Sequence, residues 1–226
     1  MTPIVERVVL ALTLDAALAR VSAAALDDER VLAEDVRDTA RGAGSLAGMA
    51  EAVLAKAGLS ATALDLVAVT LGPGSFTGIR AALALAHGIG LAASVVVAGV
   101  TVPEALAAMR PTPPGRRLWV AIDSRRGRVF LDRGGDTLAV ALDDLPMPCG
   151  PLAVAGDAAP EVAARLVARG ADVLVAPQRL PEPRGIARAA RDRLRGNLPP
   201  RLAQPFYVDP PEARLPVGGL RPAPAG

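Results

Sequence analysis

The stretch that decides the fold runs from Leu64 to Arg80 and reads LDLVAVTL followed by GPGSFTGIR. The apolar run Leu64–Leu71 has the length and composition of a strand buried in a sheet. The glycine-rich turn Gly72–Gly78 follows it, and glycines let a backbone take positive φ angles and approach a neighbour closely. Ser75 or Thr77 can cap the helix that we expect over about residues 77–92. The stretch therefore predicts a strand, a tight turn and a helix.

This turn allows two interpretations. A helix N-terminus behind a glycine-rich turn can bind an anion, but no lysine follows the last glycine as in a P-loop, and the spacing is not GxGxxG. The alternative is a tight connection whose glycines serve geometry alone, and the residues support the two about equally. The residues concerned are Gly72, Pro73, Gly74, Ser75, Phe76, Thr77, Gly78 and Arg80.

Three strands are predicted before this unit, at Val8–Leu14, Leu18–Leu26 and Arg30–Val36. The connections between them are short, so they form an antiparallel meander. A helix over residues 44–57 follows, with Ser45 as its cap and Gly58 as its stop. With a further strand at Ser94–Val100, the order β-β-β-α-β-α-β predicts a mixed sheet with helices packed on it.

Pro103 and Arg110–Gly115 are interpreted as the boundary between two lobes. Beyond it we expect a hairpin (Leu118–Ile122 and Arg128–Asp132), a β-α-β unit (Leu152–Ala155, a helix at 160–169, Val173–Ala176) and a helix at 184–195. The predicted division is an N-terminal lobe over 1–102, a C-terminal lobe over 103–204 and a Pro/Gly-rich tail over 205–226 that can return to the first lobe.

The composition includes few residues of the types that commonly act in catalysis or bind metals. The chain has 226 residues, 51% hydrophobic and 21% charged, which is typical of a folded protein. Aromatic residues make up only 2%, which argues against an aromatic platform for single-stranded nucleic acid. With one histidine, His87, and one cysteine, Cys149, a His/Cys metal site and an intramolecular disulfide are excluded. His87 is expected to be a buried structural residue, and we predict no catalytic residue, no metal and no cofactor.

The net charge of +2 is small. Residues 1–100 carry a net −3 and residues 101–226 a net +5, so the second half permits a polyanionic partner without requiring one. The apolar run Val8–Leu14 is too short for a membrane span or a signal peptide. The expected location is cytoplasmic, with no membrane partner.

The helix over 77–92 carries a small-residue stripe at Gly78, Ala82, Ala86 and Gly90. Such a stripe lets another helix or a sheet approach closely. It can pack on the chain's own sheet, or it can form a docking face for another subunit together with the apolar stripe of the 44–57 helix. We adopt the second as the hypothesis. The interface residues it predicts are Leu46, Met49, Val53, Gly78, Ile79, Ala82, Leu83 and Ala86.

Four arginines follow one face of the helix over 184–195 and could contact phosphates. A solvated helix face is the commoner outcome for such a run. The candidate phosphate-contacting residues are Arg184, Arg188, Arg191 and Arg195.

GPGSFTGIR and two further segments resemble the signatures of the bacterial TsaB (YeaZ) family. Residues 121–130, AIDSRRGRVF, resemble the family's second-lobe hairpin, and residues 205–213, PFYVDPPEA, resemble its terminal P-x-Y-L-R-x-P motif. The resemblance implies an actin-like, Hsp70-type ATPase fold with two lobes, each an α/β layer with a mixed sheet flanked by helices.

The resemblance also implies a non-catalytic subunit that binds TsaD in the transfer of a threonylcarbamoyl group to adenosine 37 of tRNA. It implies TsaE as a further partner, tRNA contact through the complex, and a homodimer when the chain is alone. The family's first strand commonly ends in Asp-Thr-Ser or Asp-Thr-Ala, and we match these positions to Thr13, Leu14 and Asp15, which argues against nucleotide binding there. The region before the first helix, Gly42–Ser45, also lacks the His or Glu that members often carry.

Other functions remain as alternatives. A small-molecule kinase or nucleotide-binding enzyme of the same fold class would use GPGSFTG at the phosphates. An independent tRNA-binding protein would use the arginine face of the 184–195 helix. A metallopeptidase is excluded because the sequence offers no plausible zinc ligands.

Overall fold

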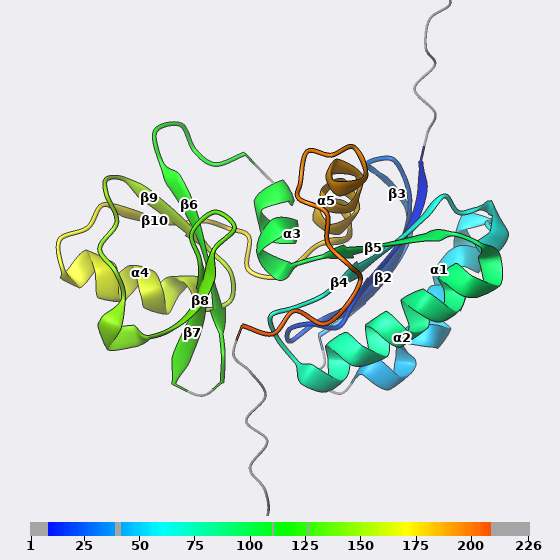
Figure 1. The fold of residues 1–226 in the computed structure, drawn as a ribbon, viewed down its shortest axis with the longest axis horizontal. Coiled ribbons are helices and arrows are strands. Elements are labelled where there is room, and N and C mark those ends of the chain that lie inside the picture. The colour runs from blue at the N-terminus through cyan, green and yellow to red at the C-terminus, as the bar shows by residue number, and fades with distance from the viewer. Residues whose placement is uncertain (1–8, 39–41, 110, 126, 209–226) are drawn as a thin grey trace, which may run out of the picture.

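The structure is a computed structural model, and it describes residues 9–38, 42–109, 111–125 and 127–208. The chain forms two lobes, each built on a five-stranded sheet (Figure 1). The strand order is β3-β2-β1-β4-β5 in the first sheet and β10-β9-β6-β7-β8 in the second. Both sheets contain an antiparallel meander followed by parallel strands, so the two lobes share one connectivity.

The first sheet confirms the predicted mixed sheet. Its strands are β1 (Leu10–Asp15), β2 (Val21–Asp27), β3 (Arg30–Arg37), β4 (Leu66–Thr70) and β5 (Val96–Val100). The first three pair antiparallel, and β4 pairs parallel with both β1 and β5. Strands β1, β2 and β4 are buried almost throughout, as continuous apolar runs predict.

Helices α1 (Leu46–Ala57) and α2 (Phe76–Ala93) cover one face of this sheet (Figure 1). A short 3-10 turn, η1 (Gly42–Ser45), precedes α1, and another, η2 (Ala61–Ala63), follows it. Gly58 ends α1 in the left-handed conformation, with φ of 67°. Ser75 caps α2 through its side chain, whereas Ser45 occupies the cap position of α1 without a capping hydrogen bond.

The other face of the first sheet is covered by α3 (Val102–Met109) and α5 (Pro183–Leu194). Both helices pack on the first sheet, although α3 lies next to the predicted boundary at residue 103 and α5 follows the second lobe in sequence. Gly185 allows the two helices to meet, since a Cβ there would lie 2.4 Å from the Ala105 carbonyl oxygen. Sequence analysis missed α3 because Pro103 suggested a break, yet proline is tolerated in the first turn of a helix.

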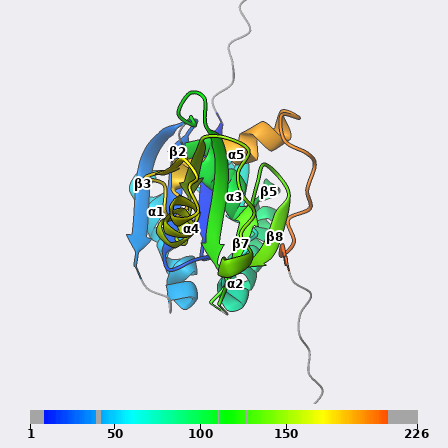
Figure 2. The same cartoon turned by 90° about the vertical axis from the view of Figure 1, so that its left-hand side faces the viewer.

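The second lobe contains β6 (Arg117–Asp123), β7 (Arg128–Asp132), β8 (Thr137–Ala141), η3 (Leu142–Asp144), β9 (Leu152–Ala155), α4 (Ala159–Ala168) and β10 (Val173–Val175). Helix α4 packs on one face of this sheet (Figures 1 and 2). From the other face, Val120 and Ile122 join the core of the first lobe. The hairpin and the β-α-β unit were predicted, whereas β8, a short and half-buried edge strand, was not.

After α5 the chain returns along the first lobe. The Phe206 amide donates to the Leu71 carbonyl at 2.9 Å, and the His87 ring lies 2.8 Å from the Ala203 carbonyl oxygen. The start of the predicted tail thus packs on the first lobe, whereas its residues 209–226 lie outside the described residues. His87 is exposed and holds this segment, so its predicted burial was wrong and its structural role stands.

Candidate functional site

The glycine-rich turn packs directly on the loop that joins β1 to β2. A Cβ at Gly74 would lie 2.1 Å from the Ala17 carbonyl oxygen, and one at Gly78 would lie 2.0 Å from that of Ala16. The Ser75 amide donates to the same Ala17 oxygen at 2.6 Å. Both glycines are therefore required by contact with the chain's own backbone, which favours the geometric interpretation of the turn.

Several amides at the start of α2 already have partners within the chain. The Ser75 hydroxyl accepts from the Gly78 amide at 3.2 Å, and the Ser75 carbonyl accepts from the Ile79 amide at 2.9 Å. With the Ser75 amide bound to Ala17, two of the four amides that this helix N-terminus would offer to a phosphate, those of Ser75 and Gly78, are satisfied within the chain. The geometry thus argues against an anion site at this turn.

Asp15 is a buried carboxylate at the end of β1. It is the last residue of β1, and Ala16 and Ala17 follow it. Its Oδ1 accepts from the Thr70 hydroxyl at 2.5 Å and from the Ala17 amide at 3.0 Å, and its buried Oδ2 has no hydrogen-bond partner. Burial raises the pKa of Asp15 to about 6, against the lowering effect of the Thr70 hydrogen bond.

The predicted interface residues lie inside the chain. All eight are buried and pack between α1, α2 and the first sheet: Leu46, Met49, Val53, Gly78, Ile79, Ala82, Leu83 and Ala86. Gly90, which completes the stripe on α2, touches β5, because a Cβ there would lie 2.4 Å from Val97 Cγ2. These side chains therefore hold the two helices to their own sheet and are not available to a partner.

A different face of α2 is exposed, and it too carries small residues at every fourth position: Ala84, Gly88 and Ala92. Leu91 beside them is 86% exposed. Between α2 and η2 a shallow groove of about 370 Å³ is lined by Ala61, Thr62, Ala84, Leu85, Gly88, Ile89, Ala92 and Ala93. No charged side chain lines it, so this part of the surface is apolar and open.

Two helix glycines, Gly48 in α1 and Gly88 in α2, are exposed and meet nothing within 4 Å of an added Cβ. Glycine inside a helix costs about 1 kcal/mol relative to alanine. No packing within the described part of the chain requires either residue. Close approach of another backbone to these helices would account for both glycines.

An aromatic cluster lies beside the start of α2. The Arg80 guanidinium carbon is 3.7 Å from the Phe76 ring centroid, and Arg80 Nε donates to Tyr207 Oη at 3.0 Å. The rings of Phe76 and Tyr207 are stacked with centroids 5.9 Å apart, and their residues are 51% and 40% exposed. The cluster fastens the returning C-terminal segment to α2 and leaves two rings at the surface.

The arginines of α5 bind the turn between β2 and β3. Arg188 forms two hydrogen bonds with the Glu29 carboxylate, at 2.9 and 2.5 Å, and Arg191 donates to Asp28 at 3.0 Å. The hydrogen bond from Arg188 holds the pKa of Glu29 below its usual value. Arg184 donates to the Glu29 carbonyl at 3.1 Å, whereas Arg195 is exposed at the end of the helix. Three of the four candidate tRNA contacts are therefore engaged in fastening α5 to the sheet.

Among the described residues no group of three or more His, Cys, Asp and Glu side chains could hold a metal ion. Cys149 is exposed in the second lobe. Within the same residues α2 is the one helix long and apolar enough to cross a membrane, although helices of soluble proteins also meet that test. Only 33% of α2 is buried, so much of this apolar helix lies at the surface.

The two lobes with matching connectivity, each a mixed sheet flanked by helices, define an actin-like fold. A family model described as TsaD, tRNA N6-adenosine threonylcarbamoyltransferase, matches residues 43–166, which is more than half of the chain. The chain belongs to the TsaB (YeaZ) family.

Three relatives illustrate the match. The tRNA threonylcarbamoyladenosine biosynthesis protein TsaB of Escherichia coli K12 is 35% identical over 83 residues, which are 36% of this chain and 36% of that protein. YeaZ from Pseudomonas aeruginosa is 26% identical, with a TM-score of 0.71 over 88% of this chain and 99% of that one. A second Pseudomonas aeruginosa structure, of an uncharacterized protein with similarity to peptidase YEAZ, has 24% identity and a TM-score of 0.73 over 89% of this chain and 100% of that one.

Proposed function

We propose that this chain takes part in the biosynthesis of threonylcarbamoyladenosine in tRNA as a non-catalytic subunit that binds a TsaD-type threonylcarbamoyltransferase. Family membership supports the pathway, because the family model carries the transferase description and the Escherichia coli relative carries the pathway name. TsaE is a further proposed partner, tRNA is contacted through the complex, and the expected location is the cytoplasm.

The observation that carries the docking role is the exposed face of α2. Ala84, Gly88 and Ala92 form an uncharged stripe, and Leu91 beside it is 86% exposed. An exposed apolar face of this kind marks a protein contact, and a small-residue stripe lets a partner helix approach closely. Gly48 on α1 is likewise exposed and meets nothing within 4 Å of an added Cβ. The same face supports a homodimer when the partner is absent.

The non-catalytic assignment is supported by the described residues. They contain no cluster of metal-binding side chains, and the glycine-rich turn is filled by the backbone of Ala16 and Ala17. A kinase that holds phosphate at this turn would need its amides free, so that alternative is not favoured. The arginine face of α5 is also not favoured as an independent tRNA site, because Arg188 and Arg191 are paired with Glu29 and Asp28.

The test is a light-scattering titration of the full chain with TsaD from the same organism, followed by a tRNA-modification assay. The variants are Ala84→Arg and Gly88→Arg, both at exposed positions of α2, and the matched control is Ala164→Arg on the exposed side of α4. A large charged side chain in the centre of an apolar contact should weaken the complex at least about tenfold. The control should bind normally.

Unchanged binding by both α2 variants would contradict the docking face. Modification that proceeds equally well without this chain would contradict the proposed role in the pathway. The Gly88→Arg variant should fold well, because an added Cβ meets nothing within 4 Å and arginine favours helix over glycine.

A further inference from the structure

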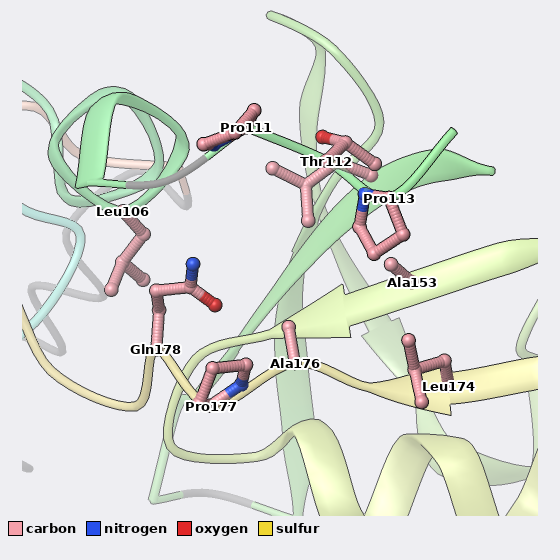
Figure 3. A pocket seen from close by; sticks show the side chains of 10 residues that line it. Leu106, Pro111, Thr112, Pro113, Ala153, Leu174, Ala176, Pro177 and Gln178 are labelled. Atoms are coloured by element: carbon pink, nitrogen blue, oxygen red, sulfur yellow. The ribbon is translucent and has the colours of Figure 1, made fainter. Parts of the chain in front are cut away.

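A cavity of about 170 Å³ lies where the chain passes between the two lobes (Figure 3). Both segments that connect the lobes, here called the two passages, line it. Pro111–Pro113 belongs to the segment from α3 to β6, and Ala176–Gln178 belongs to the segment from β10 to α5. Leu106 of α3 closes the cavity on the side of the first lobe. The cavity is therefore distinct from the α2 face and in contact with both lobes.

The walls of the cavity are uncharged. Its ten lining residues include three prolines, three leucines and two alanines, and the two polar members are Thr112 and Gln178. Apolar walls with a small number of polar groups are typical of small-molecule sites. Because burying an unpaired charge is costly, such walls select an uncharged ligand. Proline rings also pack well on flat rings, as in the grooves that bind proline-rich peptides.

Gln178 supplies a hydrogen-bonding group that can orient a ligand in the cavity. It is only 9% exposed, and its Oε1 is buried without a hydrogen-bond partner. Figure 3 shows its carboxamide between Leu106 and Ala176, with the amide end turned toward the cavity. Buried acceptors in folded proteins are almost always satisfied, so this oxygen calls for a donor that enters the cavity.

The size of the cavity limits the ligand to one ring. A cavity of about 150 Å³ engineered into another protein binds benzene, so about 170 Å³ holds one six-membered ring with a small substituent. A carboxamide offers an acceptor and a donor side by side. A ligand with an N–H next to a C=O complements it, whichever way the Gln178 amide is turned.

We propose that this cavity binds a small uncharged amide, with a single flat ring between the proline and leucine walls and an N–H donated to Gln178 Oε1. The ligand class comprises aromatic primary carboxamides and six-membered cyclic amides. Such a ligand contacts both passages of the chain and so favours one relative position of the lobes. This inference concerns the isolated chain and does not depend on the proposed function.

The test is a titration of the full chain with benzamide, followed by protein NMR. Saturable shifts with a Kd of about 1 mM are expected for a ligand of this size. Benzoate has the same shape but carries a charge and no N–H, and toluene lacks the amide. Both should bind at least about tenfold more weakly.

Two variants locate the site. Gln178→Leu should weaken benzamide binding about tenfold and leave toluene binding unchanged or stronger. Ala176→Leu should fill the cavity and abolish binding of both. If that variant does not fold, Leu174→Phe serves the same purpose, because Leu174 is 43% exposed at the rim.

Three results would overturn the proposal: no saturable binding of benzamide, equal binding of benzoate, or benzamide binding that both substitutions leave unchanged. The first would indicate a cavity filled by water alone.

Discussion

Replacing Asp15 by asparagine should stabilise the chain near neutral pH and have little effect in acid. Asp15 is fully buried at the end of β1, and burial raises its pKa from 3.8 to about 6. The folded state therefore binds this proton more tightly than the unfolded state does. The stability that the proton provides is complete below about pH 4 and is lost as the pH rises through about 6.

The magnitude follows from the size of the shift. About two pH units correspond to about 3 kcal/mol of unfolding free energy that the native chain loses between acid and neutral pH. Asparagine keeps an oxygen for the Thr70 hydroxyl and the Ala17 amide and removes the buried charge. Its amide nitrogen replaces Oδ2, which has no hydrogen-bond partner, so the cost of an unsatisfied group is similar in both chains.

The assay is urea unfolding of the native chain and Asp15→Asn from about pH 4 to about pH 7.5. The variant's advantage in unfolding free energy should grow from near zero to about 3 kcal/mol over this range. Thr70→Val provides the control, since loss of its hydrogen bond should move the native titration to higher pH. A constant difference between native chain and Asp15→Asn at every pH would refute the reasoning.

Three further predictions concern stability and are measured by urea unfolding at neutral pH. Gly88→Ala should raise the unfolding free energy by about 0.5–1 kcal/mol, because the site is open and helical; a loss would contradict the absence of packing there. Arg193→Met should cost about 3 kcal/mol, because it removes the nearer of the two arginines that pair with the largely buried Glu104 carboxylate and leaves only Arg201, at 4.0 Å; a change below about 1 kcal/mol would be inconsistent with this pairing. Gly74→Ala should lower the unfolding free energy by more than about 2 kcal/mol, because its Cβ would lie 2.1 Å from the Ala17 carbonyl oxygen. An unfolding free energy equal to that of the native chain would rule that contact out.

The sequence predicted most of the strands and helices and the lobe architecture. Continuous apolar runs identified β1, β4 and β9, and glycine identified the end of α1. The sequence could not assign α5 to the first lobe. The amphipathic pattern of a helix shows which of its faces is buried, but not which sheet covers that face. Periodicity likewise found one small-residue stripe on α2 without telling whether it faces the chain's own sheet or a partner.

The candidate site was only partly predictable for the same reason. Gly78, Ala82 and Ala86 are as small as Ala84, Gly88 and Ala92, and only the structure separates the buried set from the exposed one. Asp15 could have been recognised as the carboxylate that ends an apolar strand. Gln178 Oε1 is buried without a hydrogen-bond partner in a cavity that residues from both lobes line. No local sequence pattern could have revealed this arrangement.

The return of α5 to the first sheet has a consequence for how the protein folds as it is synthesised. Ribosomes release a chain from its N-terminus, and domains generally fold in that order. Here β1–β5 emerge before α5 exists, so the face that Ile186 and Ala190 later cover stays partly open while residues 117–175 are made. The second lobe can thus complete its sheet before the first lobe is closed. Translation must reach the end of α5 at Leu194 before the lobe that began the chain is finished.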